Sequence, residues 1–277
     1  RGLFLFVMRT ILKCYLLLNT LSVDVALGAV VSCLFLCSTF DVNVSWQTSL
    51  CLGLVVWLIY TVDHLLDARR MNAQATTLRH QFHSRNFRIM IWFTIAVAAA
   101  SGFLVLNIER EILIVGVILA TLVLIYFLFL KKLSAAKELF GAVLYFSGVM
   151  IPVIAKQPNA DFLAMPGTLF FLLVLINLIL FSWFDLDSDK EHDHKTIATQ
   201  LGDRNVRLLL GVLYAVAGLY LLAGFSSELS EKLWFTFLVM YLLLLVVFLF
   251  PDWHRKGERY RVVGDFVFFV PLVYLIS

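Results

Sequence analysis

Long apolar stretches alternate with short polar segments along almost the whole chain. Nine of them are long enough, or nearly so, to cross a bilayer, which takes about 20 mostly apolar residues. They cover residues 22–40, 46–62, 89–107, 112–130, 139–155, 165–184, 208–225, 233–250 and 262–276. The stretches do not alternate with period two as barrel strands would, and backbone groups cannot go unpaired in lipid, so they predict helices. The pattern predicts an all-α integral membrane protein with nine transmembrane helices around a central cavity.

The composition is consistent with a lipid environment. Hydrophobic residues make up 61% of the 277 residues and charged residues 15%, and the mean hydropathy is +0.92. This apolar content excludes a water-soluble globular chain, and it also excludes intrinsic disorder. The net charge is only +3, and the basic residues do not form one patch on a soluble domain. Nucleic acid is therefore not an expected partner, whereas membrane lipid is.

The basic residues are distributed unequally between the two sides of the membrane. When the nine stretches are taken as successive spans, all but three of the 22 lysine and arginine residues fall on the side of the N-terminus. The three exceptions are Arg110, Lys156 and Lys232. The positive-inside rule then places the N-terminus and the longer loops in the cytoplasm, in a multi-pass protein of the plasma or inner membrane. We expect a single transmembrane domain over residues 1–277, in which residues 1–19 form an interfacial segment.

Two acidic motifs end the second and sixth stretches on the same predicted side. The first aspartate motif contains Asp63 and Asp67, and the second contains Asp185, Asp189 and Asp193. A four-residue step keeps side chains on one helix face, where carboxylates repel each other unless water or a cation compensates them. Clustered carboxylates without sulfur ligands suit Mg²⁺, and nearby lysine and arginine residues favour a diphosphate bridged by that ion. We predict that both motifs are cytoplasmic and face each other.

The chain resembles the UbiA superfamily of intramembrane prenyltransferases. That family has nine transmembrane helices, with motifs of the form N-D-x-x-D-x-x-x-D after the second helix and D-x-x-x-D-x-x-x-D after the sixth. The second aspartate motif is present here in full, and Lys195-Thr196 follows it as in the family. The stretch from Tyr126 to Lys132 is similar to another basic element of the family.

The first aspartate motif departs from the family pattern. Asp63 stands for Asn, His64 for the next Asp and Met71 for the last Asp, while Asp67 is retained. Arg79 is followed by histidine where the family has proline. This difference predicts weaker cation binding by the first motif, with His64 contacting the diphosphate instead.

The resemblance implies a set of site residues. The expected catalytic residues are Asp67, Asp185 and Asp189. The expected metal ligands are Asp63, Asp67, Asp185, Asp189 and Asp193. The expected contacts to the substrate diphosphate are Arg69, Arg79, Lys131, Lys195 and His64.

The implied function is a Mg²⁺-dependent prenyl transfer inside the membrane. The enzyme would ionise a polyprenyl diphosphate and pass the prenyl group to a lipophilic acceptor. A terpene cyclase or a diphosphate lyase, which needs no acceptor, fits the same motifs. A membrane transporter is the non-enzymatic alternative, although transporters tend to place charges at mid-membrane on broken helices.

Overall fold

The computed structural model describes residues 18–70, 82, 85–128, 137–162, 164–191, 194–227 and 229–276, with the side chains of 67–70, 126–128 and 226–227 left out. All regular elements in these ranges are helical. The first half of the chain forms α2 Val23–Thr39, α3 Trp46–Arg70, α5 Phe87–Val105, α6 Arg110–Leu128, α7 Lys137–Val149 and α8 Ile151–Lys156. The second half forms α9 Met165–Phe184, α10 Leu186–Glu191, α11 Ile197–Ser227, α12 Glu231–Leu249, α13 Pro251–Arg255, η3 Lys256–Glu258, α14 Arg259–Phe266, η4 Val267–Phe269 and α15 Pro271–Ile276. The prediction of an all-α membrane protein is confirmed.

Five helices in the described part of the chain are long and apolar enough to cross a membrane. They are Trp46–Leu66, Phe87–Val105, Met165–Phe184, Ile197–Phe225 and Glu231–Leu249. Large apolar side chains on their outer surfaces are strongly exposed, including Trp92 (72%), Phe103 (68%) and Leu222 (70%). Such contiguous apolar exposure fits contact with lipid. The count of nine spans stays a prediction. Residues 1–17 of the predicted interfacial segment lie outside the described part of the chain.

The chain divides into two compact units. Unit 1 contains residues 1–30 and 45–108, and unit 2 contains residues 31–44 and 109–277. In unit 1, α3 packs along α5, and Trp57 is buried with Ala26, Leu65 and Met90. The Trp57 indole donates a hydrogen bond of 2.8 Å to the carbonyl of Leu21, which satisfies the polar end of this buried ring. The expectation of one domain over the whole chain stays a prediction.

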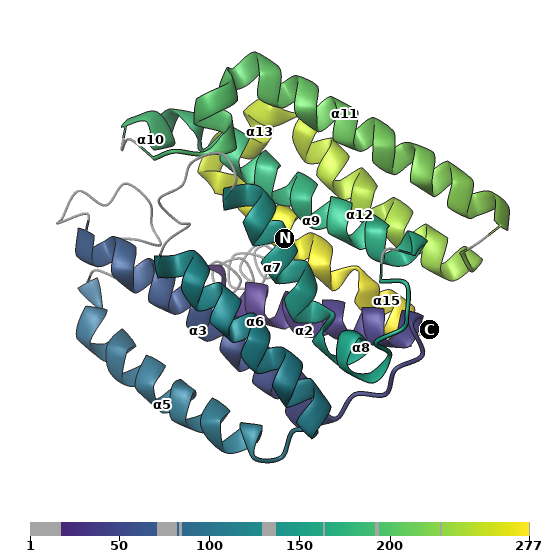
Figure 1. Cartoon of the computed structure of the whole chain (residues 1–277). Helices are drawn as coiled ribbons and strands as arrows, with labels where there is room; N and C mark the ends of the chain where they lie inside the picture. Colours follow the sequence, from purple (N-terminus) through teal and green to yellow (C-terminus); the bar gives the residue numbers. More distant parts are fainter. Residues whose placement is uncertain are drawn as a thin grey trace, which may run out of the picture. The chain divides into compact units, whose positions relative to one another are not determined.

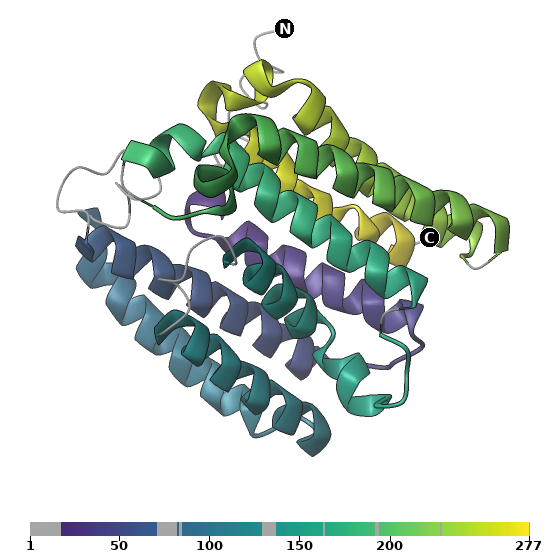
Figure 2. The same ribbon diagram turned by 45° about the horizontal axis from the view of Figure 1, so that its top comes forward.

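Unit 2 is built around α9. Helices α7, α11, α12 and α14 all contact α9, and α9, α11 and α12 run side by side (Figures 1 and 2). Two-thirds of α9 is buried, and its side chains Phe170, Leu173, Ile176 and Leu180 are fully enclosed. A helix that is apolar on all sides and surrounded by other helices is held in a defined position by packing on each face. The residues that follow its last turn are therefore placed precisely within this unit.

Three predicted spans differ from the helices observed. The span 139–155 is broken at Met150 into α7 and α8, with Pro152 in the first turn of α8, because proline lacks the N–H that would continue the earlier helix. The span 262–276 is divided into α14, η4 and α15, and Pro271 begins the last of these. Helix α11 starts at Ile197 rather than near residue 208, and it is interrupted at Gly202, whose φ of +77° favours glycine.

Candidate active site

The first residue of the second aspartate motif, Asp185, lies at the C-terminal end of helix α9. Asp185 is the C-cap of α9, and its N–H donates to the carbonyl of Phe181 at 2.9 Å. The chain continues into α10, where the N–H of Asp189 donates to the carbonyl of Asp185 at 2.8 Å. This bond between residues four apart is helical, so the turn between α9 and α10 keeps the four-residue step that the motif requires.

Both carboxylate oxygens of Asp185 are occupied by side chains from α14. Arg261 Nη2 donates to Asp185 Oδ2 at 2.7 Å, and the Tyr260 hydroxyl donates to Asp185 Oδ1. Arg261 Nε also donates to the Tyr260 hydroxyl oxygen at 3.1 Å and lies 3.5 Å from Glu258 Oε2. The pair is largely enclosed, with the Arg261 and Asp185 side chains 22% and 25% exposed. Asp185 is thus the acceptor in a charge-assisted network that ties α9 to α14.

Aromatic rings hold this network in place. The Tyr260 ring stacks on Phe184, with centroids 4.5 Å apart and an angle of 5° between the planes. The Tyr260 and Phe181 rings pack edge to face, with their centroids 5.7 Å apart. Burial raises the pKa of Tyr260, and the charge of Asp185 adds to this effect, so the hydroxyl stays protonated and donates.

Asp189 has less compensation than Asp185. Its side chain is 16% exposed, and among the described residues the His194 ring forms an ion pair with it, with 3.7 Å between Nδ1 and Oδ1. Burial raises the pKa of Asp189 and the negative charge of Asp185 raises it further, against the opposing effects of Lys137, His194 and a side-chain hydrogen bond with Thr196. The backbone reinforces the pairing, because His194 N–H donates to the Asp189 carbonyl at 2.8 Å. A partly buried carboxylate without a close basic side chain such as Arg261 beside Asp185 is suited to receive a cation.

The N-terminus of α11 is capped beside this motif by Glu138 and Ser182. Glu138 Oε2 accepts from the N–H of Ile197 at 3.2 Å, and Ser182 Oγ accepts from the N–H of Ala198 at 3.4 Å. Glu138 is only 6% exposed, and burial raises the pKa of its carboxyl group. The sequence analysis did not single out this residue, nor the contacts of Tyr260 and Arg261 with Asp185, because the partners lie on segments far apart along the chain.

The first aspartate motif lies in unit 1. Helix α3 runs to Arg70, eight residues beyond the predicted span, so Asp63, His64, Asp67 and Arg69 all lie on one helix. His64 is buried and Asp63 half-buried, while the side chains of Asp67 and Arg69 are outside the description. Because the two motifs belong to different units, the expectation that they face each other stays a prediction.

The remaining predicted residues are placed only in part. Lys195 is exposed on the segment between α10 and α11. Arg79, Lys131 and Asp193 lie outside the described residues. Within the described part of the chain, no three His, Cys, Asp or Glu side chains come together as a metal site. The hard carboxylate oxygens of Asp185 and Asp189 are nevertheless the donor type that Mg²⁺ prefers, so the donor chemistry fits this ion.

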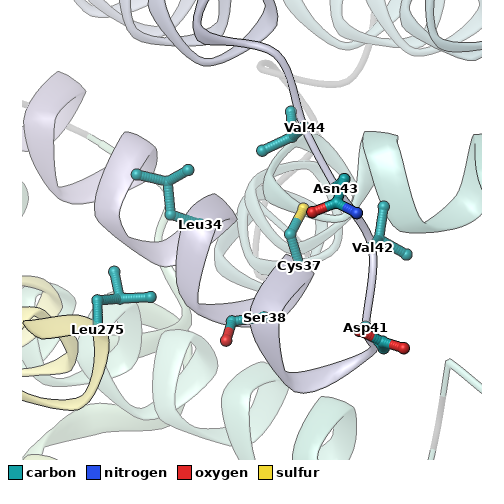
Figure 3. Close-up of a pocket in the computed structure, with 8 residues that line it drawn as sticks. All are labelled: Leu34, Cys37, Ser38, Asp41, Val42, Asn43, Val44 and Leu275. Atoms are coloured by element: carbon teal, nitrogen blue, oxygen red, sulfur yellow. The ribbon is translucent and has the colours of Figure 1, made fainter. Parts of the chain in front are cut away.

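Unit 2 also contains a pocket at the end of α2. It has a volume of about 390 Å³ and is lined by the end of α2, the loop after it and Leu275 of α15 (Figure 3). Beside it, Lys156 Nζ donates to the carbonyl of Asn43 at 2.8 Å and pairs with Glu109. None of the predicted site residues lines this pocket.

Comparison with known proteins identifies the family of the chain. The model of the UbiA prenyltransferase family matches residues 25–270, nearly the whole chain. The chain belongs to the UbiA prenyltransferase family. It is accordingly an enzyme of the prenyltransferase class, and the resemblance noted in the motifs is confirmed. A comparison with curated protein sequences gives no match.

Two solved structures share the UbiA fold over their whole length. One is the apo structure of a UbiA homolog from Aeropyrum pernix K1, with 17% identity, a TM-score of 0.63, and coverage of 93% of this chain and 97% of the other. The second is described as digeranylgeranylglyceryl phosphate synthase in membranes, with 16% identity, a TM-score of 0.54 and coverage of 96% of each chain. At these identities the likeness shows the fold.

Proposed function

We propose that this UbiA-family enzyme is a Mg²⁺-dependent intramembrane prenyltransferase that ionises a polyprenyl diphosphate and transfers the prenyl group to a lipophilic acceptor. The observation that carries the proposal is the environment of Asp189. This carboxylate is partly buried, lies one helical turn after Asp185, and has the His194 ring at 3.7 Å within the described part of the chain. Membership of the family supports the reaction class.

The residues divide into two roles in this proposal. Asp63, Asp67, Asp185, Asp189 and Asp193 would hold Mg²⁺. Arg69, Arg79, Lys131, Lys195 and His64 would bind the diphosphate oxygens. When bound, Mg²⁺ supplies positive charge that stabilises the departing diphosphate.

The basic side chains assist the departure of the leaving group by hydrogen bonding. As the bond between the allylic carbon and the diphosphate oxygen breaks, its electron pair leaves with the diphosphate, and arginine and lysine donors are matched to the growing negative charge. The acceptor nucleophile then forms the new bond to the allylic carbon and loses a proton. Asp67, Asp185 and Asp189 are the proposed catalytic residues because they position this charge.

The outer surfaces of both units favour lipid substrates. The exposed surfaces of α5 and α11 are apolar, which suits both a prenyl chain and a lipophilic acceptor arriving from the bilayer. The structural neighbour described as digeranylgeranylglyceryl phosphate synthase is named for a product that carries isoprenoid groups on a lipid. The charge asymmetry supports a plasma or inner membrane protein whose N-terminus and aspartate motifs are cytoplasmic.

A turnover assay with matched variants tests the proposal. Purified enzyme in liposomes is supplied with a polyprenyl diphosphate, a candidate lipophilic acceptor and Mg²⁺, and both the prenylated product and the released diphosphate are measured. Asp189→Asn should lower turnover by about a hundredfold or more, since the charge is lost while size is kept. Asp187→Asn, at an exposed position between the two motif residues, should leave turnover near wild type.

The same assay distinguishes the other reactions that fit the motifs. Diphosphate release with the prenyl diphosphate alone, giving a cyclised or eliminated product, would indicate a cyclase or lyase. Full activity of Asp189→Asn would show that this carboxylate does not bind the metal.

A further inference from the structure

Arg261 is the cation nearest to Asp185 in the described structure. Its guanidinium donates to Asp185 Oδ2 at 2.7 Å, whereas Asp189, one turn further along, lies 3.7 Å from the His194 ring and is hydrogen-bonded to the neutral side chain of Thr196. The two aspartates of the same motif therefore differ in how their charge is compensated. Asp185 already has a full positive charge beside it, and this charge comes from α14 rather than from the motif itself.

The guanidinium is held in this position by contacts besides the ion pair. It lies 5.2 Å from the Tyr260 ring centroid and 6.0 Å from that of Phe181, both within the range of cation–π attraction. Glu258 approaches its Nε at 3.5 Å. Tyr260 holds the second oxygen of Asp185, and its ring is stacked on Phe184. Arg261 of α14 is thus held against the end of α9 by several contacts.

A divalent cation at Asp185 would meet this guanidinium as a like charge. The two cations cannot both lie against one partly buried carboxylate without strong repulsion, because the low local dielectric screens them poorly. A diphosphate brings negative charge that could compensate both at once, and arginine is the side chain best matched to phosphate oxygens. Metal and diphosphate binding should therefore be coupled through this residue.

We propose that Arg261 is the internal counter-ion of the second aspartate motif: it pairs with Asp185 and releases that carboxylate to the metal only when a diphosphate takes up its charge. This inference rests on the proposed function, because it takes the second motif as the metal site. Arg261 would then join the residues that bind the diphosphate, and the affinity for the metal would depend on whether a diphosphate is bound. In this scheme Arg261 and Asp185 form a switch between two pairings.

Mn²⁺ binding in the absence of turnover tests the proposal. Free Mn²⁺ is measured by electron paramagnetic resonance in titrations of the purified protein, with and without inorganic pyrophosphate, each corrected for the binding of Mn²⁺ to pyrophosphate alone. In wild type, pyrophosphate should tighten Mn²⁺ binding to the protein. Arg261→Gln should bind Mn²⁺ roughly tenfold more tightly than wild type without pyrophosphate, and should gain much less from adding it, since the repelling charge is gone.

Arg259→Gln is the matched control. It removes the same charge from the same helix, but Arg259 is exposed and its guanidinium lies over the Trp253 ring at 4.4 Å instead of at Asp185. Its Mn²⁺ affinity and its response to pyrophosphate should equal those of wild type. Equal tightening in Arg259→Gln and Arg261→Gln would show only a general effect of net charge and would overturn the proposal.

A second variant keeps the proposal open to refutation if Arg261→Gln does not fold. The double variant Asp185→Asn/Arg261→Gln replaces the ion pair with a neutral pair of similar size. Without pyrophosphate it should bind Mn²⁺ within about threefold of wild type, because Arg261 already pairs with Asp185 in the wild type. A loss of tenfold or more would mean that Asp185 is free for the metal from the start.

Asp189→Asn separates the failure of this inference from that of the proposed function. If Asp189→Asn binds Mn²⁺ as wild type does, the second motif is not the metal site and the proposed function fails. If Asp189→Asn loses Mn²⁺ binding while Arg261→Gln behaves like wild type, the metal site stands and only the role given to Arg261 is wrong.

Discussion

Asp189 lies in surroundings that favour its neutral form. Burial and the neighbouring Asp185 raise the pKa of its carboxyl group, and Lys137 and His194 offset this only in part. A group whose pKa is higher in the folded than in the unfolded state costs stability once the pH exceeds the unfolded value, because ionisation is then more favourable in the unfolded chain. A carboxylate kept at such a cost is typical of a binding site rather than of a structural ion pair.

The first prediction follows from that cost. Asp189→Asn should raise the melting temperature of the metal-free protein in detergent at neutral pH, while it abolishes prenyl transfer. The amide cannot ionise, so the penalty for a buried charge disappears, and this gain is absent in the exposed control Asp187→Asn. Differential scanning fluorimetry with a chelator present measures the effect. A lower melting temperature for Asp189→Asn would mean that its charge stabilises the fold.

Glu138 gives a second prediction, on pH. Its pKa is raised by burial from the ordinary value of 4.5, and its Oε2 accepts from the N–H of Ile197. Glu138→Gln keeps an acceptor for that N–H but places an NH₂ group where Oε1 is buried without a hydrogen bond, which costs about 1–3 kcal/mol at every pH. Above the pKa that Glu138 has in the unfolded chain, ionisation of this buried carboxyl group lowers the stability of the wild type, and the variant has no such cost. The stability deficit of the variant should therefore shrink as the pH rises from 4.5 to 7, and a deficit that grew would contradict the raised pKa.

Among the elements, α9 and α14 approach each other unusually closely at one glycine. A Cβ atom at Gly264 would overlap the Phe181 ring and would lie 2.6 Å from Asn177 Oδ1. Small residues allow membrane helices to come into contact, where packing rather than water exclusion holds them together. Because Tyr260 and Arg261 lie one turn before Gly264, this contact also fixes how they reach Asp185.

Gly264→Ala should accordingly destabilise the protein by about 1–3 kcal/mol, as overpacking typically does. It should also lower prenyl transfer, since moving α14 away from α9 loosens the contacts of Arg261 with Asp185. Gly218→Ala on α11 is the control, because its Cβ would meet nothing within 4 Å. Thermal unfolding and turnover of both variants provide the check. Equal behaviour of the two would show that the contact at Gly264 tolerates a methyl group.

The sequence predicted elements well where composition alone decides them. Helix α9 has the bounds expected from hydropathy, Met165–Phe184, because uniformly apolar residues both enter the membrane and continue the helix. Helix α3 exceeds its predicted span because backbone hydrogen bonding continues through the charged residues up to Arg70, whereas hydropathy does not. The breaks near Met150 and before Pro271 depend on local proline effects within apolar stretches, which a hydropathy window averages out.

The sequence predicted the spacing within the second aspartate motif but not the side chains that contact it. The four-residue spacing of Asp185 and Asp189 is local, and the helical hydrogen bond between them confirms the expected step. The partners Arg261 and Tyr260 follow Asp185 by about 75 residues, and nothing in the local pattern joins the two segments. Glu138 likewise reaches α11 only through the packing of α7 and α9, so its capping role depends on tertiary structure.

For the whole molecule, the distribution of charge gives the strongest topological expectation. All but three lysine and arginine residues fall on one predicted side, and the translocation cost of basic residues makes that side cytoplasmic. Arg85 follows the first aspartate motif, Asp187 lies within the second, and Lys232 lies in the first turn of α12, on the opposite predicted side. All three positions are exposed, so they can report sidedness directly.

Single cysteines at these positions, in a chain whose four native cysteines are replaced, therefore test the topology. In sealed right-side-out vesicles, a membrane-impermeant maleimide should label Lys232→Cys at once, and Arg85→Cys and Asp187→Cys only after permeabilisation. The reason is that an even number of spans separates positions 85 and 187, and an odd number separates 187 and 232, if the predicted division holds. Labelling of 85 and 187 from opposite sides would place the two aspartate motifs across the membrane from each other, where they could not hold one diphosphate between them.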